Sequence, residues 1–333
     1  MRKPTIRDVA SRAGVGIGTV SRVLNDSTQV RAETRQKVLD AIEELGFSPN
    51  VAARQLSGGK TWTVGVLTPF FTNPSFVQRL SGIQDVLDDS GYDLVLYSIR
   101  THEQLKRRLS EITTSSRVDG LIILTLHPTP DDLPMGNKNL PLMLVIEEPD
   151  DYFPHIMVDN PQGGRMATEF LIERDHAQIG FVGDELENSL YLRATRQRFH
   201  GFRAAMTDAR LPIVNEWCRF GVHTQQSAFE NAYSILCESD RPTAIVASSD
   251  TMAFGVIEAA NALGLRVPQD VAIIGFDDIP AAQIVQLTTV RQPLFRSGQL
   301  AAERLFEFMA TGEVPAEDFR TELPLEIVRR ETV

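Results

Sequence analysis

The sequence is poor in cysteine and has no long apolar segment. Cys218 and Cys237 are its only cysteines, and they stand 19 residues apart without a CxxC pairing. This spacing excludes a disulfide framework and a cysteine zinc site, and it is typical of a reducing compartment. No apolar run approaches about 18 residues, and no basic-then-apolar leader opens the chain. We therefore expect a cytoplasmic protein that has no membrane partner.

Short catalytic motifs are missing as well. The chain contains no GxxxxGK followed by Ser or Thr, no GxSxG and no HExxH, and its six histidines lack the spacing of metal ligands. Gly14, Gly16 and Gly18 resemble part of a dinucleotide-binding motif, but that motif follows a strand, whereas a helix is predicted before Gly14. We expect no enzyme, no cofactor and no metal.

Charge is distributed unevenly along the chain. The net charge of −11 over 333 residues argues by itself against nucleic acid as a partner. Residues 1–60, however, contain ten Lys or Arg and six Asp or Glu, a net charge of +4, so the remaining residues carry −15. A basic segment joined to an acidic body is typical of a protein whose basic segment alone contacts phosphates.

A capped helix is predicted at the start of the chain. Thr5 can cap it, and Asp8, three residues later, can complete a capping box. Apolar residues then recur at helical spacing on one face, and these are Ile6, Val9, Ala10 and Ala13. Gly14 supplies the backbone freedom that a sharp turn needs.

A second short helix follows the turn, with Val20, Val23 and Leu24 as its apolar stripe. The opposite side offers hydroxyl and guanidinium groups, which can donate to phosphates and base edges, from Thr19, Ser21 and Arg22. Two short helices joined by such a turn are typical of a helix-turn-helix, whose second helix enters a major groove. A helical hairpin without a DNA partner has the same periodicity, so the pattern alone leaves both interpretations open.

Residues 5–56 carry an ordered set of motifs. They read Thr5-Ile-x-Asp8-Val-Ala, Ala13-Gly14-Val15, Thr19-Val-Ser-Arg-Val-Leu-Asn25, Thr34-Arg and Ser48-Pro-Asn-x-x-Ala-Arg54-x-Leu56. In these motifs the segment resembles the headpiece of the lactose-repressor (LacI) family of bacterial transcription regulators. It departs from the family at Gly16 and Arg31, where serine is usual. Gly18 removes a side chain from the DNA-facing surface and costs the helix about 1 kcal/mol relative to Ala.

The resemblance implies DNA contacts beyond these two helices. A third helix is predicted over 32–45, and the segment 50–56 is too short to be a stable helix alone in water. We expect it to fold on the operator, where Leu56 wedges between base pairs in the minor groove; ordinary packing in a linker is the alternative. The predicted DNA-binding residues are Thr5, Ile17, Gly18, Thr19, Ser21, Arg22, Asn25, Asn50, Ala53, Arg54 and Leu56.

From Thr61 onward the pattern alternates strands and helices, and this rhythm runs through the chain twice, which predicts two doubly wound parallel-sheet lobes. The expected fold is an all-α helix-turn-helix headpiece plus an α/β bilobed core similar to periplasmic binding proteins. The expected domains are the headpiece 1–47, a hinge helix and linker 48–60, and the core 61–333. The N-lobe is expected to take about 61–160 with a crossover near 291–320, and the C-lobe about 161–290 with 321–330.

The core carries further motifs of the same family, among them Asn73-Pro74, Val158-Asp159-Asn160, Arg198-x-x-Gly201-Phe202, Ser249-Asp250 and Gln292-Pro293. Ligands in such sheets bind at the carboxyl ends of strands. Carboxylate, guanidinium and amide groups there can bond sugar hydroxyls, and Phe70 or Phe71 can cover an apolar ring face. The effector-binding residues that the resemblance implies are Phe71, Asn73, Asp159, Arg198, His223, Ser249, Asp277 and Gln292.

Two of these positions depart from the family, since Ser249 replaces a frequent Asn and His223 a frequent aromatic residue. Structural salt bridges remain the alternative role for Arg198 and Asp277. The resemblance implies a homodimeric repressor of a carbohydrate-utilisation operon, which binds a palindromic operator and responds to a small sugar-like effector. A solute-binding protein of a transport system is the alternative; it shares the bilobed fold but leaves the basic headpiece without a role.

Overall fold

The computed structural model describes residues 4–24, 29–47, 60–115, 117–133, 142–146, 152–185, 193–316 and 319–333. The chain divides into two compact units, residues 1–61 and 62–333. None of the helices in the described part of the chain has the length and apolar character needed to span a membrane.

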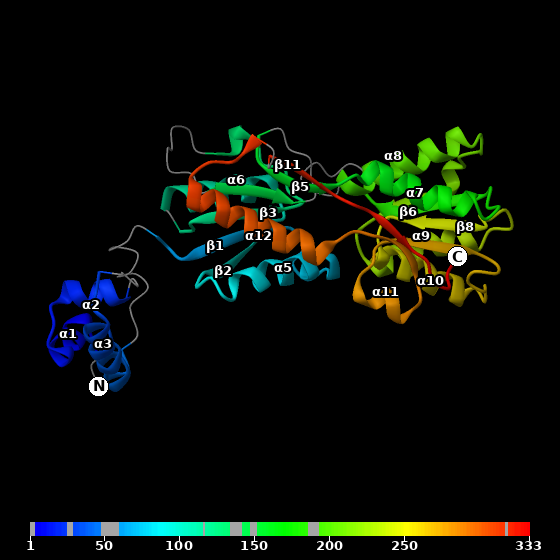
Figure 1. The fold of residues 1–333 in the computed structure, drawn as a ribbon. Coiled ribbons are helices and arrows are strands. Elements are labelled where there is room, and N and C mark those ends of the chain that lie inside the picture. Colours follow the sequence, from blue (N-terminus) through cyan, green and yellow to red (C-terminus); the bar gives the residue numbers. More distant parts are fainter. Residues whose placement is uncertain are drawn as a thin grey trace. The chain divides into compact units, whose positions relative to one another are not determined.

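The described part of the headpiece consists of three helices, α1 (Ile6–Ala13), α2 (Ile17–Leu24) and α3 (Ala32–Leu45) (Figure 1). The predicted capping box is present, because the Asp8 carboxylate accepts hydrogen bonds from both the backbone N–H and the hydroxyl of Thr5, each at 2.7 Å. Gly14 ends α1 in the left-handed conformation, with φ 66°. The two predicted helices and their turn are therefore confirmed.

The headpiece has a small core to which each helix contributes. Val9, Val20 and Val38 come from α1, α2 and α3, and all three are fully buried. Burying each of these side chains stabilises the fold by about 1.5–3 kcal/mol. The apolar stripes that define the helices in the sequence thus lock the three helices together and leave their other sides free.

A parallel six-stranded sheet forms the N-lobe, in the order β11-β5-β4-β3-β1-β2. Its strands are β1 (Thr63–Thr68), β2 (Asp93–Ser98), β3 (Gly120–Leu124), β4 (Leu142–Ile146), β5 (His155–Val158) and β11 (Arg320–Leu323). Alternate residues of β3 point to opposite faces, so Ile122 packs with α5 (Pro74–Leu87) and α12 (Leu294–Thr311), and Ile123 with α6 (His102–Ser115). A 3₁₀ turn, η1 (Pro130–Asp132), follows β3.

The second sheet, in the C-lobe, has the order β12-β10-β9-β8-β6-β7. Its strands are β6 (Ile179–Asp184), β7 (Cys218–Gly221), β8 (Ala244–Ala247), β9 (Ala272–Asp277), β10 (Thr288–Arg291) and β12 (Glu326–Val328). Only β12 is antiparallel among these pairings, to β10 at the sheet edge. The prediction of doubly wound parallel lobes is confirmed with this one exception.

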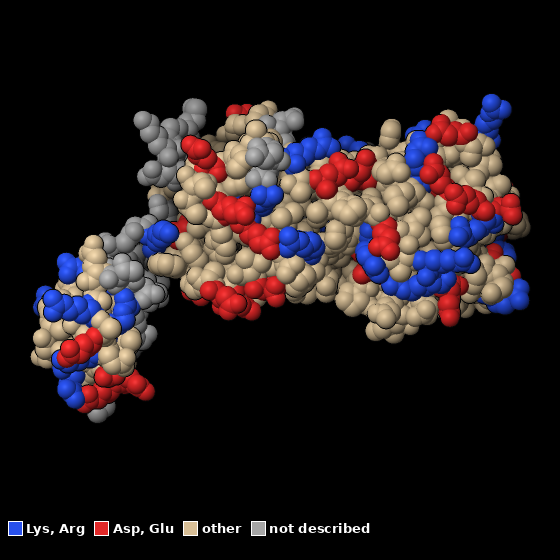
Figure 2. All heavy atoms as spheres, viewed as in Figure 1, with Lys and Arg blue, Asp and Glu red and all other residues tan. Residues whose placement is uncertain are grey.

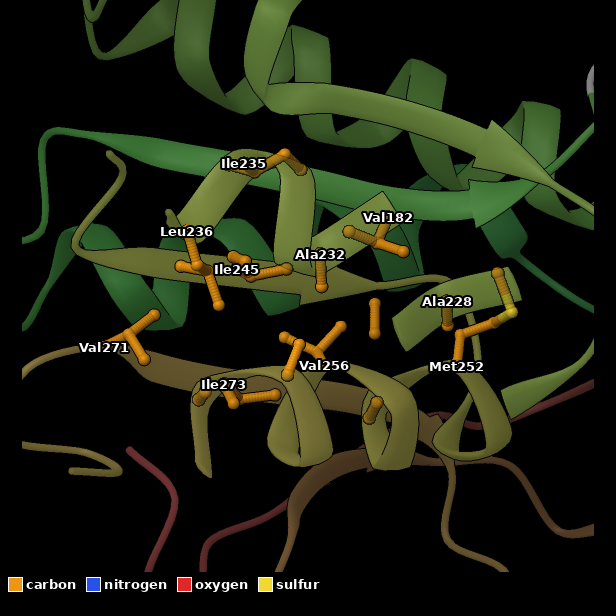
Figure 3. Close-up of a cluster of buried hydrophobic side chains, with 14 of the residues drawn as sticks. Val182, Ala228, Ala232, Ile235, Leu236, Ile245, Met252, Val256, Val271 and Ile273 are labelled. Carbon is orange, nitrogen blue, oxygen red and sulfur yellow. The ribbon is translucent and has the colours of Figure 1, made fainter. Parts of the chain in front are cut away.

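Helices cover both faces of the second sheet. On one face, Ile245 and Ile273 pack against α9 (Gln225–Leu236) and α10 (Asp250–Ala262), as Figure 3 shows. On the other, Phe181 and Ile274 pack against α7 (Asn160–Ile172) and α8 (Arg193–Asp208). The short elements α11 (Pro280–Ile284) and η2 (Asn215–Trp217) complete the lobe.

The chain crosses between the lobes three times: between β5 and α7, between β10 and α12, and between β11 and β12 (Figure 1). This corrects the expected lobe boundary, because β11 belongs to the N-lobe sheet and the C-lobe resumes only at β12. Four elements, β7, α11 and the 3₁₀ turns η1 and η2, were not predicted from the sequence. Each residue of β7 is half-buried at a sheet edge, so its four residues show no alternating pattern.

Candidate functional site

The headpiece presents one side of α2 to solvent. Ile17, Gly18 and Arg22 are exposed, and Ser21 is half-buried one turn from Ile17. These four positions repeat at helical spacing and share one face, whereas Thr19 lies half-buried beside it. Figure 2 shows Lys and Arg side chains on the visible face of this headpiece. Thr5 directs its hydroxyl to Asp8 at the start of α1.

The remaining residues predicted to contact DNA lie outside the described residues. They are Asn25, Asn50, Ala53, Arg54 and Leu56. The hinge helix and the wedge role of Leu56 therefore stay predictions.

The core contains a pocket between its lobes, at the carboxyl ends of the strands. Asp184 ends β6, Asp277 ends β9 and Thr125 follows β3. The pocket encloses about 420 Å³ of atom-free space, its open mouth included. Its lining comprises Ser75, Phe76, Thr125, Asp184, Ala194, Thr195, Arg198, His223, Ser249 and Asp277.

The structure brings four of the eight predicted effector residues to this pocket, namely Arg198, His223, Ser249 and Asp277. Arg198 is held on three sides. Its Nε donates to Asn160 Oδ1 at 2.8 Å, its Nη1 donates to the Ser248 carbonyl at 2.6 Å, and its guanidinium carbon stands 3.5 Å from the centre of the Phe276 ring. The Asp277 carboxylate lies 3.9 Å from Nη1. This packing orients the guanidinium before any ligand arrives.

The partly buried His223 and the buried Asp184 form a pair in the pocket wall, with Nδ1 and Oδ1 2.6 Å apart. Asp184 also accepts a hydrogen bond from the Thr195 hydroxyl at 2.5 Å. Burial disfavours the imidazolium, but the carboxylates of Asp184 and Asp277 outweigh it and raise the pKa of His223. Burial alone would raise the pKa of Asp184, yet His223, Thr195 and Arg198 together hold it below its ordinary value.

His223 also makes a contact between the lobes. Its ring stacks on Phe70 of the N-lobe, with centroids 6.3 Å apart and planes at 22°. Phe70 in turn meets the edge of Phe76, which lines the pocket. His223 therefore contacts both the Asp184 carboxylate of its own lobe and an aromatic side chain of the other lobe.

Asp277 occupies a strained position. Its φ of 121° and the φ of 57° at Asp278 are both uncommon for residues other than glycine. Asp250 stabilises this turn, because its carboxylate accepts hydrogen bonds from the Ile279 N–H and the Thr289 hydroxyl. Burial and the charge of Asp277 raise the pKa of Asp250 well above its ordinary value. Strain held in place in this way is typical of functional sites.

Thr125 is the N-lobe counterpart of this strain. It has φ 55°, which is an outlier for a β-branched residue, and it is buried at the pocket. Among the described residues, its hydroxyl has no hydrogen-bond partner. A buried hydroxyl without a partner is costly, so a ligand that bonds it would recover that free energy.

The other four predicted effector residues lie elsewhere. Phe71 is 43% exposed and does not line the pocket, whereas Phe70 stacks on His223. Asn73 precedes α5 as its N-cap residue, and Asp159 caps α7 by accepting from the Gln162 N–H. Gln292 bonds to Asp277 from behind the pocket rather than lining it.

The sequence reasoning passed over Asp184, Thr195 and Thr125. A signal for two of them existed, because Asp184 and Thr125 come at or just after the end of a predicted strand, where ligands of parallel sheets bind. Thr195 and Ser75 carried no such signal, since both lie within or beside helices and reach the pocket through the packing of the lobes.

The pocket offers hydroxyl, carboxylate, imidazole and guanidinium groups around a small space, which suits a ligand rich in hydrogen-bonding groups. Within the described residues, no group of His, Cys, Asp or Glu side chains could hold a metal ion. A helix-turn-helix headpiece joined to a bilobed core with an interlobe pocket defines a ligand-binding transcription regulator.

Comparison with known proteins identifies the family. Residues 5–50 match the bacterial regulatory proteins of the lacI family, and residues 168–333 match the periplasmic binding protein-like domain. The chain is 36% identical to the HTH-type transcriptional repressor PurR of Pasteurella multocida over 91% of each chain, and 34% identical to catabolite control protein A of Priestia megaterium over 92% of each. The chain belongs to the LacI family of transcriptional repressors, which combine a DNA-binding headpiece with a ligand-binding domain.

Solved structures agree with this assignment. The lac repressor dimer bound to operator and the anti-inducer ONPF is similar with a TM-score of 0.85 and 29% identity over 99% of each chain. The transcriptional regulator CelR in complex with cellobiose is similar with a TM-score of 0.71 and 29% identity, over 99% of this chain and 100% of that one.

Proposed function

We propose that this repressor acts in the cytoplasm as a homodimer on a palindromic operator of a carbohydrate-utilisation operon, and that a small sugar-like effector bound in the interlobe pocket switches it. The observation that carries the proposal is the combination of two features: α2 exposes Ile17, Gly18 and Arg22, and the core surrounds a small pocket with oriented polar groups. The proposal includes no catalysis.

On DNA, α2 would enter the major groove, and the two copies of a dimer would bind half-sites about one duplex turn apart. Arg22 is suited to base edges or phosphates, and Ser21 to either. The segment 50–56 would insert Leu56 in the minor groove between the half-sites.

DNA binding is tested by selecting a duplex from a random pool with the full-length chain and measuring its affinity by fluorescence anisotropy. Affinity should fall steeply as salt rises, because phosphate contacts release counterions. Arg22→Ala should weaken binding, and Leu56→Ala should weaken specific binding much more than nonspecific binding. Equal losses for Leu56→Ala would refute the wedge, and failure to select any duplex would favour the solute-binding alternative.

The effector is sought by thermal shift of the full-length chain with neutral sugars, sugar phosphates, nucleosides and purines. A ligand of the pocket should lose its stabilising effect in Arg198→Ala, while that variant still binds the selected duplex specifically. If Arg198→Ala loses both, Arg198 is structural and the pocket assignment fails. Linkage requires that a ligand that weakens DNA binding is itself bound more weakly by the DNA complex.

A further inference from the structure

The two lobes carry equivalent buried arginines. Arg79 is the sixth residue of α5 and Arg198 the sixth residue of α8, and these helices follow β1 and β6, which hold the same place in their sheets. Each arginine packs its backbone against a glycine of the neighbouring helix: a Cβ at Gly298 of α12 would come within 2.0 Å of the Arg79 carbonyl, and one at Gly164 of α7 within 2.0 Å of the Arg198 carbonyl.

Each arginine also bonds a carboxamide on a chain segment that crosses between the lobes. Arg198 donates to Asn160, the first residue of α7, at the crossover from β5. Arg79 Nη2 donates to Gln292 Oε1 at 3.0 Å, at the crossover from β10 to α12. A hydrogen bond between a buried arginine and a carboxamide thus holds two of the three crossovers, one from each lobe.

Asp277 joins the two arginine–carboxamide pairs. Its Oδ1 accepts a hydrogen bond from Gln292 Nε2 at 2.5 Å and lies 3.9 Å from Arg198 Nη1. The result is a continuous polar chain, every member of which is at most 5% exposed, running Asn160–Arg198–Asp277–Gln292–Arg79. Inside a protein such bonds are strong, and a member that loses its partner is costly, so the chain has few alternative arrangements.

We propose that Asn160, Gln292 and Arg79 are positioning residues. They couple the contacts that Arg198 and Asp277 make in the pocket to the angle between the lobes. Asp277 and Arg198 face the pocket, whereas the two carboxamides and Arg79 lie behind it, so a change at the pocket charges reaches α5 through the crossovers. A hydrogen-bond network of this kind is one physical route by which a pocket can be coupled to the hinge motion of two lobes. The inference rests on the proposed function only in taking this pocket as the effector site.

The test uses the full-length chain without effector. Cys218 and Cys237 are replaced by Ala, and nitroxide labels are placed on Lys106→Cys in α6 and Glu230→Cys in α9, both exposed and on different lobes. Pulsed electron resonance then gives the distance between the lobes. Gln292→Leu keeps the side-chain volume but removes both hydrogen bonds of the side-chain amide. It should shift the distance between the labels or broaden its distribution. It should also change affinity for the selected duplex by about two- to thirtyfold.

Gln299→Leu is the matched control. Gln299 lies on the same helix α12 and its amide also bonds a residue of α5, the exposed Asp85, but it has no contact with the polar chain. It should reproduce the wild-type distance and duplex affinity. Asp277→Asn combined with Gln292→Leu should move the distance by less than the sum of the two single changes, because both substitutions alter the hydrogen bond between Gln292 and Asp277.

An unchanged lobe distance in Gln292→Leu, or fully additive shifts in the double variant, would overturn the coupling. If Gln292→Leu does not fold by circular dichroism, Gln292→Asn replaces it, because its shorter amide cannot reach both Arg79 and Asp277 and should give the same shift. Failure of the wild-type chain to bind any selected duplex would count against the proposed function alone, since the lobe distance is measured without DNA.

Discussion

The two lobes share one architecture and divide the chemistry unequally. Their sheets have equivalent strand orders, and in each a pair of helices, α5 with α12 and α7 with α8, packs at backbone distance through glycines. The four ionisable side chains that line the pocket, Asp184, Arg198, His223 and Asp277, all come from the C-lobe, whereas the N-lobe lines it with Ser75, Phe76 and Thr125.

This difference shows that the fold shared by the two lobes does not dictate which polar side chains line the pocket. The scaffold depends on alternating apolar strands and close helix contacts, which both lobes keep. The pocket depends on single residues at strand ends, where substitution leaves the sheet intact. The C-lobe therefore holds the charges, and the N-lobe can serve as the surface that closes on them.

The largest effect is expected at the shared scaffold. Gly298→Ala and Gly164→Ala each place a Cβ within 2.0 Å of a backbone carbonyl oxygen, so the helices must separate. Each substitution should destabilise the core by about 3 kcal/mol, measured by urea unfolding of the full-length chain. Equal losses of stability in the two variants would show that both lobes depend on this close packing to the same extent. A large loss in one variant alone would show that they do not.

Gly18→Ala in α2 is the control for these two substitutions. A Cβ at Gly18 meets no atom within 4 Å, so the change should stabilise the helix by about 1 kcal/mol through propensity alone. Slower amide hydrogen exchange in α2 would report it. Destabilisation by Gly18→Ala would show that helical glycines in this chain are sensitive for a reason other than close packing.

A smaller effect is expected from the C-lobe charges. His223→Gln should destabilise the core by about 2 kcal/mol near pH 6, because it removes a charged hydrogen bond to Asp184. The folded-state pKa of His223 is raised above 6.5, so this stabilisation is complete below that pH and is lost as pH rises through the folded-state pKa. The pKa of Asp184 is lowered from 3.8, so the stabilisation that its carboxylate contributes is lost only as pH falls below that value.

Urea unfolding between about pH 5 and 9 checks this window, since the gap between wild type and His223→Gln should narrow at alkaline pH. His200→Gln is the control, because His200 is exposed on α8 and should give the wild-type profile. A gap independent of pH would mean that the pKa of His223 is the same in the folded and unfolded chain, and a gap that narrows at acid pH would mean that its folded-state pKa is lowered; either result would refute the charge pair.

The smallest effect is expected in the N-lobe wall. Asn adopts the left-handed conformation more readily than a β-branched residue, so Thr125→Asn should relieve the strain at φ 55° and stabilise the core by about 1 kcal/mol. Thermal unfolding measures this gain. Thr113→Asn is the contrasting change, because Thr113 is buried in helix α6 with its hydroxyl bonded, and it should destabilise. A loss of stability in Thr125→Asn would show that the strained backbone is held by the threonine itself.

The sequence by itself determined most of the helices and strands and their order. The capping box at Thr5 and Asp8, the turn at Gly14 and the alternating strands are local patterns, and each acts over a few residues whatever the rest of the chain does. Family motifs likewise marked Arg198, Ser249 and Asp277 as pocket residues, because each motif keeps its place at a strand end or in the first turns of a helix.

Tertiary structure alone decided which neighbours those residues meet. Nothing within a few residues of Asp184 pairs it with His223, 39 residues away, or joins Arg79 to Gln292, 213 residues away. Tertiary packing also places Phe70 rather than Phe71 against His223, β11 in the N-lobe sheet and Gln292 behind the pocket. These outcomes depend on how two sheets and three crossovers pack, and packing is a property of contacts between distant segments that no local pattern encodes.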